Sequence, residues 1–160
     1  MNDPTVGEIG WLLGGRCGLT ASGILHWHDE NQNYVARLAL KATGIDAGAA
    51  RFVYRIGKLK SSEPTLLITY KGTCVYRLDV NQTHRHGTKL YTFVTHIQRR
   101  RSLIDQAESF EPNPVGVPRI DIGKRVTPRQ YRDILSAFAA PIGLDILDIT
   151  WTDPPEGRQP

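Results

Sequence analysis

One predicted strand and the loop after it carry side chains suited to moving protons or binding phosphate. Arg77, Asp79 and Asn81 alternate along the strand, and alternate residues of a strand point to the same face. His84 and His86 follow in the predicted loop. Imidazole titrates near neutral pH, so two histidines can act as base and acid in one reaction. No packing requirement explains this set of residues, and we treat it as the candidate site.

A second predicted strand, residues 89–98, carries one more histidine, His96. If the two strands form a hairpin with their apolar faces matched, His96 lies on the same face as Arg77 and Asp79. A symmetric register sets Asp79 opposite Thr92, which leaves His96 roughly 13 Å farther along the strand at the usual rise. A bulge or an asymmetric loop would bring His96 closer to Asp79. The sequence does not fix this register.

These residues support the hypothesis of a metal-independent ribonuclease or phosphodiesterase. His84 or His86 would deprotonate the attacking 2′-hydroxyl, and His96 or the other loop histidine would protonate the leaving oxygen. Arg77 would stabilise the charge that builds on the phosphorane oxygens, and Asp79 would orient a histidine. We expect no cofactor for such a reaction. Whether the chain is an enzyme stays open at this stage.

The residues that would hold the substrate follow the same two strands, and each of these signals also has a simpler interpretation. An Arg77–Asp79 pair on a solvent-facing sheet contributes little to stability. Asn81 is a common turn residue, because its side chain bonds to nearby backbone. A run of arginines is often a solvated surface, but beside an active site it would hold phosphates. The predicted substrate-binding residues are Asn81, Arg99, Arg100 and Arg101.

A zinc site is the alternative to cofactor-free chemistry. His26 and His28 form a second His-x-His pair on an earlier predicted strand. They would join a metal site only by converging with His84 and His86, since four histidines satisfy tetrahedral zinc. The sequence contains no P-loop, no G-x-S-x-G elbow and no dinucleotide-binding glycine motif.

A different class of function uses the same surface without catalysis. In this hypothesis the chain is an immunity, antitoxin or inhibitor protein. The polar sheet face and the long segment 99–126 would then bind a protein or a nucleic acid, and the histidines would be incidental. We expect no membrane partner.

Charge and composition permit an anionic partner without demanding one. Lys and Arg number 20 against 16 acidic residues, which gives a net charge of +4 and a pI near 9.2. Cys17 and Cys74 do not make a disulfide framework and have no C-x-x-C spacing, so we expect two reduced, buried thiols in a cytoplasmic protein. The N-terminus lacks a secretory pattern, and no run approaches about 18 apolar residues.

The elements that must position the site are mainly strands. Thr127 is a good N-cap and Pro128 suits a first helical position, so a helix should follow and cover one face of the sheet. We predict an α+β fold, an antiparallel meander of about six strands with one C-terminal helix, in a single domain over 1–152 with a flexible tail over 153–160. Residues 99–126 should lack regular structure, and 7–16 are ambiguous. The predicted strands are 24–28, 34–42, 51–56, 65–70, 73–81 and 89–98, with 144–151 as a candidate last strand.

The R-L-D-V-N run at 77–81, followed by His84, Gly87 and the T-H-I run at 95–97, resembles the core of a group of small uncharacterised bacterial proteins. In that group an R-x-D-x-N strand leads to a histidine and a glycine, then to a T/P-H-x-H strand and a C-terminal helix. The resemblance covers about residues 50–150 and implies an accessory role in mobile elements or defence islands. The chain departs from the pattern at Gln98, where the group tends to have a second histidine.

Overall fold

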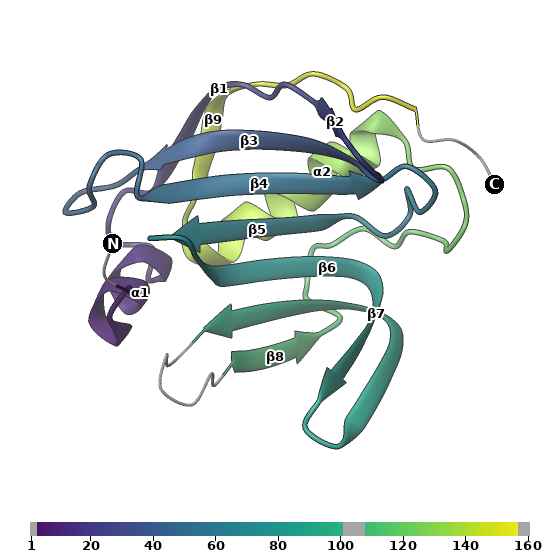
Figure 1. Cartoon of the computed structure of the whole chain (residues 1–160), viewed down its shortest axis with the longest axis horizontal. Helices are drawn as coiled ribbons and strands as arrows, with labels where there is room; N and C mark the ends of the chain where they lie inside the picture. The colour runs from purple at the N-terminus through teal and green to yellow at the C-terminus, as the bar shows by residue number, and fades with distance from the viewer. Residues whose placement is uncertain (1–2, 101–107, 157–160) are drawn as a thin grey trace.

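The computed structural model describes residues 3–100 and 108–156, and its main element is a nine-stranded sheet (Figure 1). The strand order is β8-β7-β6-β5-β4-β3-β1-β9, with β2 paired to β3 off this path. Neighbouring strands from β3 to β8 pair antiparallel, whereas β9 pairs parallel with β1. The strands are β1 (Thr20–Ile24), β2 (His28–Glu30), β3 (Asn33–Lys41), β4 (Ala50–Gly57), β5 (Thr65–Tyr70), β6 (Thr73–His86), β7 (Lys89–Arg100), β8 (Glu108–Pro112) and β9 (Asp145–Thr150).

The α+β class predicted from the sequence is confirmed, but the sheet has nine strands rather than about six. The predicted strand over 24–28 divides into β1 and β2, because the chain leaves the sheet between them. Trp27 in that gap instead donates its indole N–H to the carbonyl oxygen of Thr152, at 2.9 Å. β8 lies within the segment predicted to lack regular structure and adds a strand beside β7.

Two helices accompany the sheet, α1 (Val6–Leu13) and α2 (Pro128–Ala139). The ambiguity over residues 7–16 is resolved as α1, which begins with a capping box between Thr5 and Glu8. This box fixes the first turn despite the glycines inside the helix. It is the local sequence signal that indicates α1. Among the described residues, no helix is long and apolar enough to cross a membrane.

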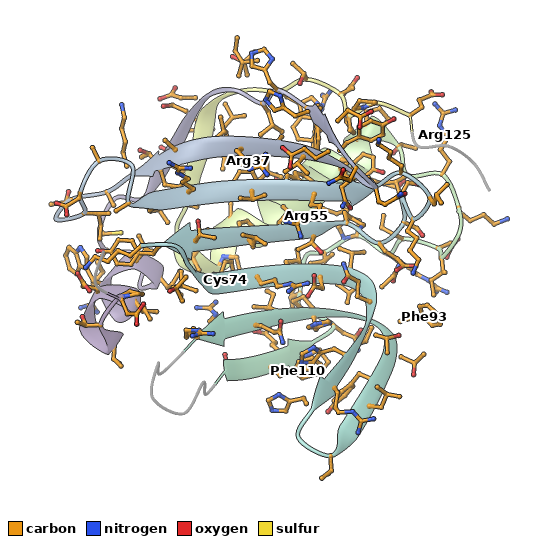
Figure 2. All side chains as sticks on the ribbon, in the orientation of Figure 1. Arg37, Arg55, Cys74, Phe93, Phe110 and Arg125 are labelled. Atoms are coloured by element: carbon orange, nitrogen blue, oxygen red, sulfur yellow. The ribbon has the colours of Figure 1, made fainter. Side chains whose placement is uncertain are left out.

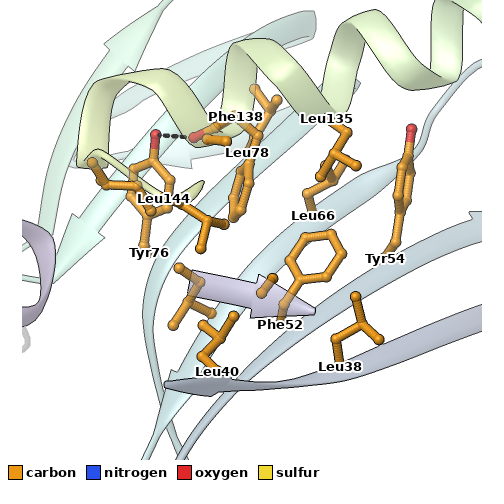
Figure 3. Close-up of a cluster of buried hydrophobic side chains, with 14 of the residues drawn as sticks. Leu38, Leu40, Phe52, Tyr54, Leu66, Tyr76, Leu78, Leu135, Phe138 and Leu144 are labelled. Carbon is orange, nitrogen blue, oxygen red and sulfur yellow. Dashed lines mark hydrogen bonds between the residues drawn. The ribbon is translucent and has the colours of Figure 1, made fainter. Parts of the chain in front are cut away.

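α2 forms where predicted and packs on one face of the sheet (Figures 1 and 3). Thr127 caps it in a box with Gln130, and the apolar stripe of the helix is buried. Phe138 contacts Phe52 and Tyr76, with ring centroids at 5.6 Å and 4.8 Å. The Tyr76 hydroxyl donates to the Phe138 carbonyl oxygen at 3.2 Å, the dashed line in Figure 3. The helix thus supplies both the apolar cover and the hydrogen-bond partner that this face requires.

The opposite face of the central strands is not covered by α2, and we call it the outer face (Figures 1 and 2). On β6 the two faces are offset by a bulge, because Thr69 pairs with Cys74 but Ile68 pairs with Tyr76. The extra residue, Val75, is buried in the core. Cys74 therefore lies on the outer face, contrary to the prediction from strict alternation, and only Cys17 is a fully buried thiol.

The chain beyond β9 was predicted to be a tail, and its described part contacts α2. Asp153 accepts hydrogen bonds from Trp151 Nε1 at 2.7 Å and from Arg132 at 3.1 Å. These bonds lower the pKa of Asp153, with the Trp151 bond contributing most. Residues 157–160 of the predicted tail lie outside the described residues.

Candidate functional site

The β6–β7 hairpin that holds the candidate site has a different register from the symmetric one considered above. Asp79 pairs with His96 rather than Thr92, and Arg77 pairs with Gln98. β6 continues to His86, which pairs with Lys89, so the connecting loop is only residues 87–88. Both histidines expected in a loop are strand residues, and the register shifts by four residues as a result.

Two irregularities bend this hairpin, one between Asp79 and Gln82 and one between Gln82 and His84. Asn81 lies within the first and adopts the left-handed conformation, with φ of 53°. Bulges increase twist and redirect side chains, and in Figure 1 the end of the hairpin turns sharply away from the plane of the sheet. This bend places His84 over His96, with ring centroids at 4.9 Å.

Asp79 is the buried anchor of the site, with 4% of its side chain exposed. Thr65 Oγ1 donates to Asp79 Oδ1 at 2.6 Å and accepts from Gln82 Nε2, also at 2.6 Å. Burial raises the pKa of Asp79, but the contacts with His96, Arg77 and Thr65 together outweigh it and lower the pKa below its ordinary value. The carboxylate is therefore charged at neutral pH and holds its cationic neighbours in place.

Arg77 and His96 both approach the same oxygen of Asp79. Arg77 Nε lies 2.6 Å from Asp79 Oδ2 without pointing its N–H along that line, so the contact is an ion pair rather than a directed hydrogen bond. His96 is 1% exposed, with Nδ1 3.0 Å from the Val94 carbonyl oxygen and Nε2 3.5 Å from Asp79 Oδ2. A carbonyl oxygen only accepts, so Nδ1 carries a hydrogen. Within the described residues, His96 Nε2 has no hydrogen-bond partner.

Phe110 of β8 fixes the planes of the two accessible histidines. Its ring lies nearly parallel to those of His84 and His86, at interplanar angles of 11° and 19° and centroid distances of 5.2 Å in both cases. The two imidazoles are 6.4 Å apart. Gln98 Nε2 lies 2.9 Å from His84 Nε2, so the amide donates to the neutral ring. His84 is half-buried and His86 is exposed.

Arg77, Asp79, His84 and His96 line a pocket of about 270 Å³ on the outer face, which we call the histidine pocket. The predicted catalytic residue His86 is not among its lining residues, and neither is Phe110. Arg77, with 39% of its side chain exposed, presents a cation to this space while its Nε stays on Asp79. Because several polar and cationic groups converge here, the pocket suits a small anionic group. Its lining residues are Cys74, Val75, Tyr76, Arg77, Asp79, Gln82, Thr83, His84, His96, Gln98 and Arg100.

Not every predicted residue reaches the histidine pocket. The Asn81 amide donates to the carbonyl oxygens of Ser62 at 3.0 Å and Ile120 at 2.8 Å, so it fastens two loops instead. The Arg99 guanidinium lies over the Tyr76 ring at 5.2 Å and is not among the lining residues. Arg101 lies outside the described residues.

The predicted zinc alternative finds no support in the arrangement of the histidines. His28 is on β2 and His26 is just before it, and two strands, β4 and β5, separate β2's partner β3 from β6. They therefore do not converge with His84 and His86. Among the residues that the structure describes, no three His, Cys, Asp or Glu side chains gather closely enough to hold a metal ion.

Several residues of the site were not predicted from the sequence. Three of them, Phe110, Thr65 and Gln98, contact a predicted residue, but none belongs to a recognisable motif. Gln82 contacts Thr65 and so supports Asp79 indirectly. The sequence did carry a signal that His84 belongs to the strand, because the polar residues at alternate positions that start at Arg77 resume after Gln82. The contribution of Phe110 depends on β8 pairing with β7, which only tertiary structure reveals.

The chain matches no protein-family model, and comparison with curated proteins and with solved structures found no match to report.

Proposed function

We propose that the histidine pocket binds a phosphodiester and that the protein is a metal-independent ribonuclease. The observation that carries this proposal is the convergence of Arg77, Arg100 and His84 on one pocket, above a buried carboxylate that is charged at neutral pH. A guanidinium binds phosphate oxygens well because its planar donors match their geometry. His84, which lines the pocket, and His86, whose ring centroid lies 6.4 Å from that of His84, supply the proton transfers that phosphodiester cleavage needs.

In the proposed reaction His84 accepts the proton of a ribose 2′-hydroxyl as that oxygen bonds to phosphorus. The bond between phosphorus and the 5′-oxygen breaks, and the leaving oxygen takes a proton from the imidazolium of His86. The products are a 2′,3′-cyclic phosphate and a 5′-hydroxyl. Protons exchanged with water then restore both histidines. The 6.4 Å between the two rings lets each reach one of the two in-line oxygens.

His96 acts as a positioning residue in this scheme rather than a group that touches substrate, because only 1% of it is exposed. Asp79 and the Val94 carbonyl hold its ring, and the ring supports His84 from below. This refines the earlier hypothesis, in which His96 was one candidate for the acid. Asp79 orients a histidine, as expected there, but that histidine is His96.

The test is cleavage of a labelled single-stranded RNA by the purified protein, with and without a chelator. We expect His84→Ala and His86→Ala each to lower kcat about 100-fold or more, and the double variant to abolish cleavage while circular dichroism stays unchanged. His28→Ala is the matched control, since His28 is an exposed histidine on β2, which is separated from β6 by three strands of the sheet. Full activity in the double variant contradicts the proposal, and loss of activity with chelator contradicts its metal-independence.

His96→Gln tests the positioning role separately. If His96 only orients His84, the variant lowers kcat more than it raises KM and moves the pH profile of kcat. A merely structural role would lower the melting temperature and leave the pH profile where it was.

A second candidate function, that of a protein-binding module, is favoured by exposed apolar side chains that lie outside the histidine pocket. Phe93 and Ile122 are each 50% exposed, and Val115 is 95% exposed. Phe93 also holds a left-handed backbone, with φ of 50°, which a bulky residue rarely adopts. Phe93→Asp abolishing capture of a partner, with RNA cleavage absent from the wild type, would favour this function over the ribonuclease.

A further inference from the structure

We infer that the outer face of the sheet binds single-stranded nucleic acid, with five arginines along β3, β4, β6 and β7 holding its phosphates. The inference extends the proposed function by naming the substrate class. It also stands on features outside the histidine pocket, and it concerns binding rather than cleavage. The arginines are Arg37, Arg51, Arg55, Arg77 and Arg100.

The strand register places these arginines on one face. Arg37 pairs with Val53 across β3 and β4, and Arg51 and Arg55 lie two residues to either side of Val53. Val53 pairs with Leu67 of β5, and Leu67 pairs with Arg77 of β6. Figure 2 shows Arg37 and Arg55 on the side turned to the viewer, with α2 behind the sheet in the same orientation.

Arg100 completes the row on β7. It lies two residues beyond Gln98, which pairs with Arg77, so its side chain is on the same face. Neighbouring strands are about 4.8 Å apart, and alternate residues of one strand are about 6.7 Å apart. The distance from one arginine of the row to the next is therefore roughly one to three times the spacing between strands. The row therefore runs from β3 to the histidine pocket, where Arg77 and Arg100 are lining residues.

The charge of this face exceeds what its own acidic residues neutralise. Arg37 pairs with Glu30, and Arg77 pairs with the buried Asp79. Within the described residues, Arg51 and Arg55 have no acidic group within 4 Å, and both are exposed. The outer face thus presents cations toward solvent over several antiparallel strands, which attracts a polyanion.

Aromatic rings at the end of the row favour a nucleic acid over an acidic peptide. Phe110 pairs with Gln98 in register, which puts it in line with Arg77, and its ring already stacks with His84 and His86. Tyr91 packs against the same ring at 4.5 Å, so the exposed His86 ring is the part of this cluster on which a base can stack. Proteins that bind single strands combine a basic track with aromatic surfaces on which bases stack. A peptide needs no such platform. An unpaired strand lies on an open sheet face with its bases accessible, whereas a duplex hides them.

The test uses a fluorescent DNA oligonucleotide of roughly 12 nucleotides, which has no 2′-hydroxyl and so is not cleaved. Binding to the full chain is followed by anisotropy over a range of salt concentrations. We expect Arg51→Gln with Arg55→Gln to weaken binding about tenfold or more and to reduce the slope of log K against log salt by about 1.4. The matched control is Arg119→Gln with Arg129→Gln, whose side chains are 93% and 91% exposed and belong to no strand.

Equal weakening by the two double variants would overturn the inference, since it would show a general response to charge. Absence of binding would also overturn it, as would displacement of the oligonucleotide by poly-glutamate at equal charge, which would identify an acidic protein as the ligand. The two proposals fail separately. DNA binding without RNA cleavage would support the proposed binding face and contradict the proposed ribonuclease. RNA cleavage that is unaffected by Arg51→Gln with Arg55→Gln would support the ribonuclease and contradict the binding face.

Discussion

The two faces of the central strands are built from alternate residues of the same segments, yet they are completed differently. On the face that α2 covers, each buried tyrosine hydroxyl has a partner within the chain. Tyr54 donates to the Tyr131 carbonyl oxygen at 3.0 Å, and Tyr76 donates to that of Phe138. On the outer face, guanidinium groups outnumber the carboxylates beside them. The covered face carries most of the buried apolar packing, and the outer face is the one that we propose binds nucleic acid.

The largest effect on stability should come from the covered face. Phe138→Ala removes a fully buried ring from between Phe52 and Tyr76, and we expect it to lower the free energy of unfolding by about 3–5 kcal/mol. Urea denaturation measures this loss. Ser136→Ala is the control, because Ser136 is exposed on the same helix. A loss no larger than that of the control would show that α2 does not complete the core.

A smaller loss of stability is expected from a substitution of Asp79, which is a buried residue of the outer face. Asp79→Asn removes the carboxylate that Arg77 and His96 both approach and leaves the Arg77 guanidinium without its ion-pair partner, which should cost about 1–3 kcal/mol. The folded state lowers the pKa of Asp79, so the stabilisation is fully present above the unfolded pKa near 3.9 and is lost as pH falls through the folded pKa. The difference between wild type and variant should therefore shrink below about pH 4.

Denaturation at a series of pH values checks this prediction, with Asp121→Asn as the control, since that side chain is 69% exposed. A difference between wild type and Asp79→Asn that stays constant down to low pH would contradict it. It would mean that the cost of the substitution comes from packing rather than from charge.

The smallest effect on stability is expected at the exposed arginines of the outer face. Arg55→Gln should leave the free energy of unfolding within about 0.5 kcal/mol of the wild type, because exposed side chains without special partners contribute little. Thermal denaturation measures it. A clear loss of stability would contradict the distinction between the two faces, because it would show that Arg55 has a structural role.

The parts of the molecule that the sequence predicted are those with local signals. Thr127 and Pro128 marked the start of α2, and its apolar stripe marked the buried side. The predicted strands 34–42, 51–56 and 65–70 correspond to β3, β4 and β5. The Thr5–Glu8 capping box was equally local, and it would have identified α1 if given more weight than the glycines.

The site was predicted only in part in its membership and not in its geometry, since His86 and Asn81 do not line the histidine pocket and Gln98, which was not predicted, does. Arg77, Asp79, His84 and His96 do come together, and Asp79 faces His96 because β6 continues to His86 and a two-residue turn follows it. Alternation cannot show a bulge, since one extra residue exchanges the two faces beyond it. Phe110 could not be assigned for a related reason: its role comes from pairing between β7 and β8.

The parallel pairing of β9 with β1 has a consequence for synthesis of the chain. Ile24 pairs with Thr150, and the backbone N–H of Leu25 donates to the Thr150 carbonyl oxygen, at 3.0 Å. A nascent polypeptide that has emerged only as far as α2 does not yet contain β9, so β1 lacks that neighbour. An open strand edge is a template for strand addition from another chain. The first strand is therefore protected against such pairing at this edge only once the last strand has been synthesised.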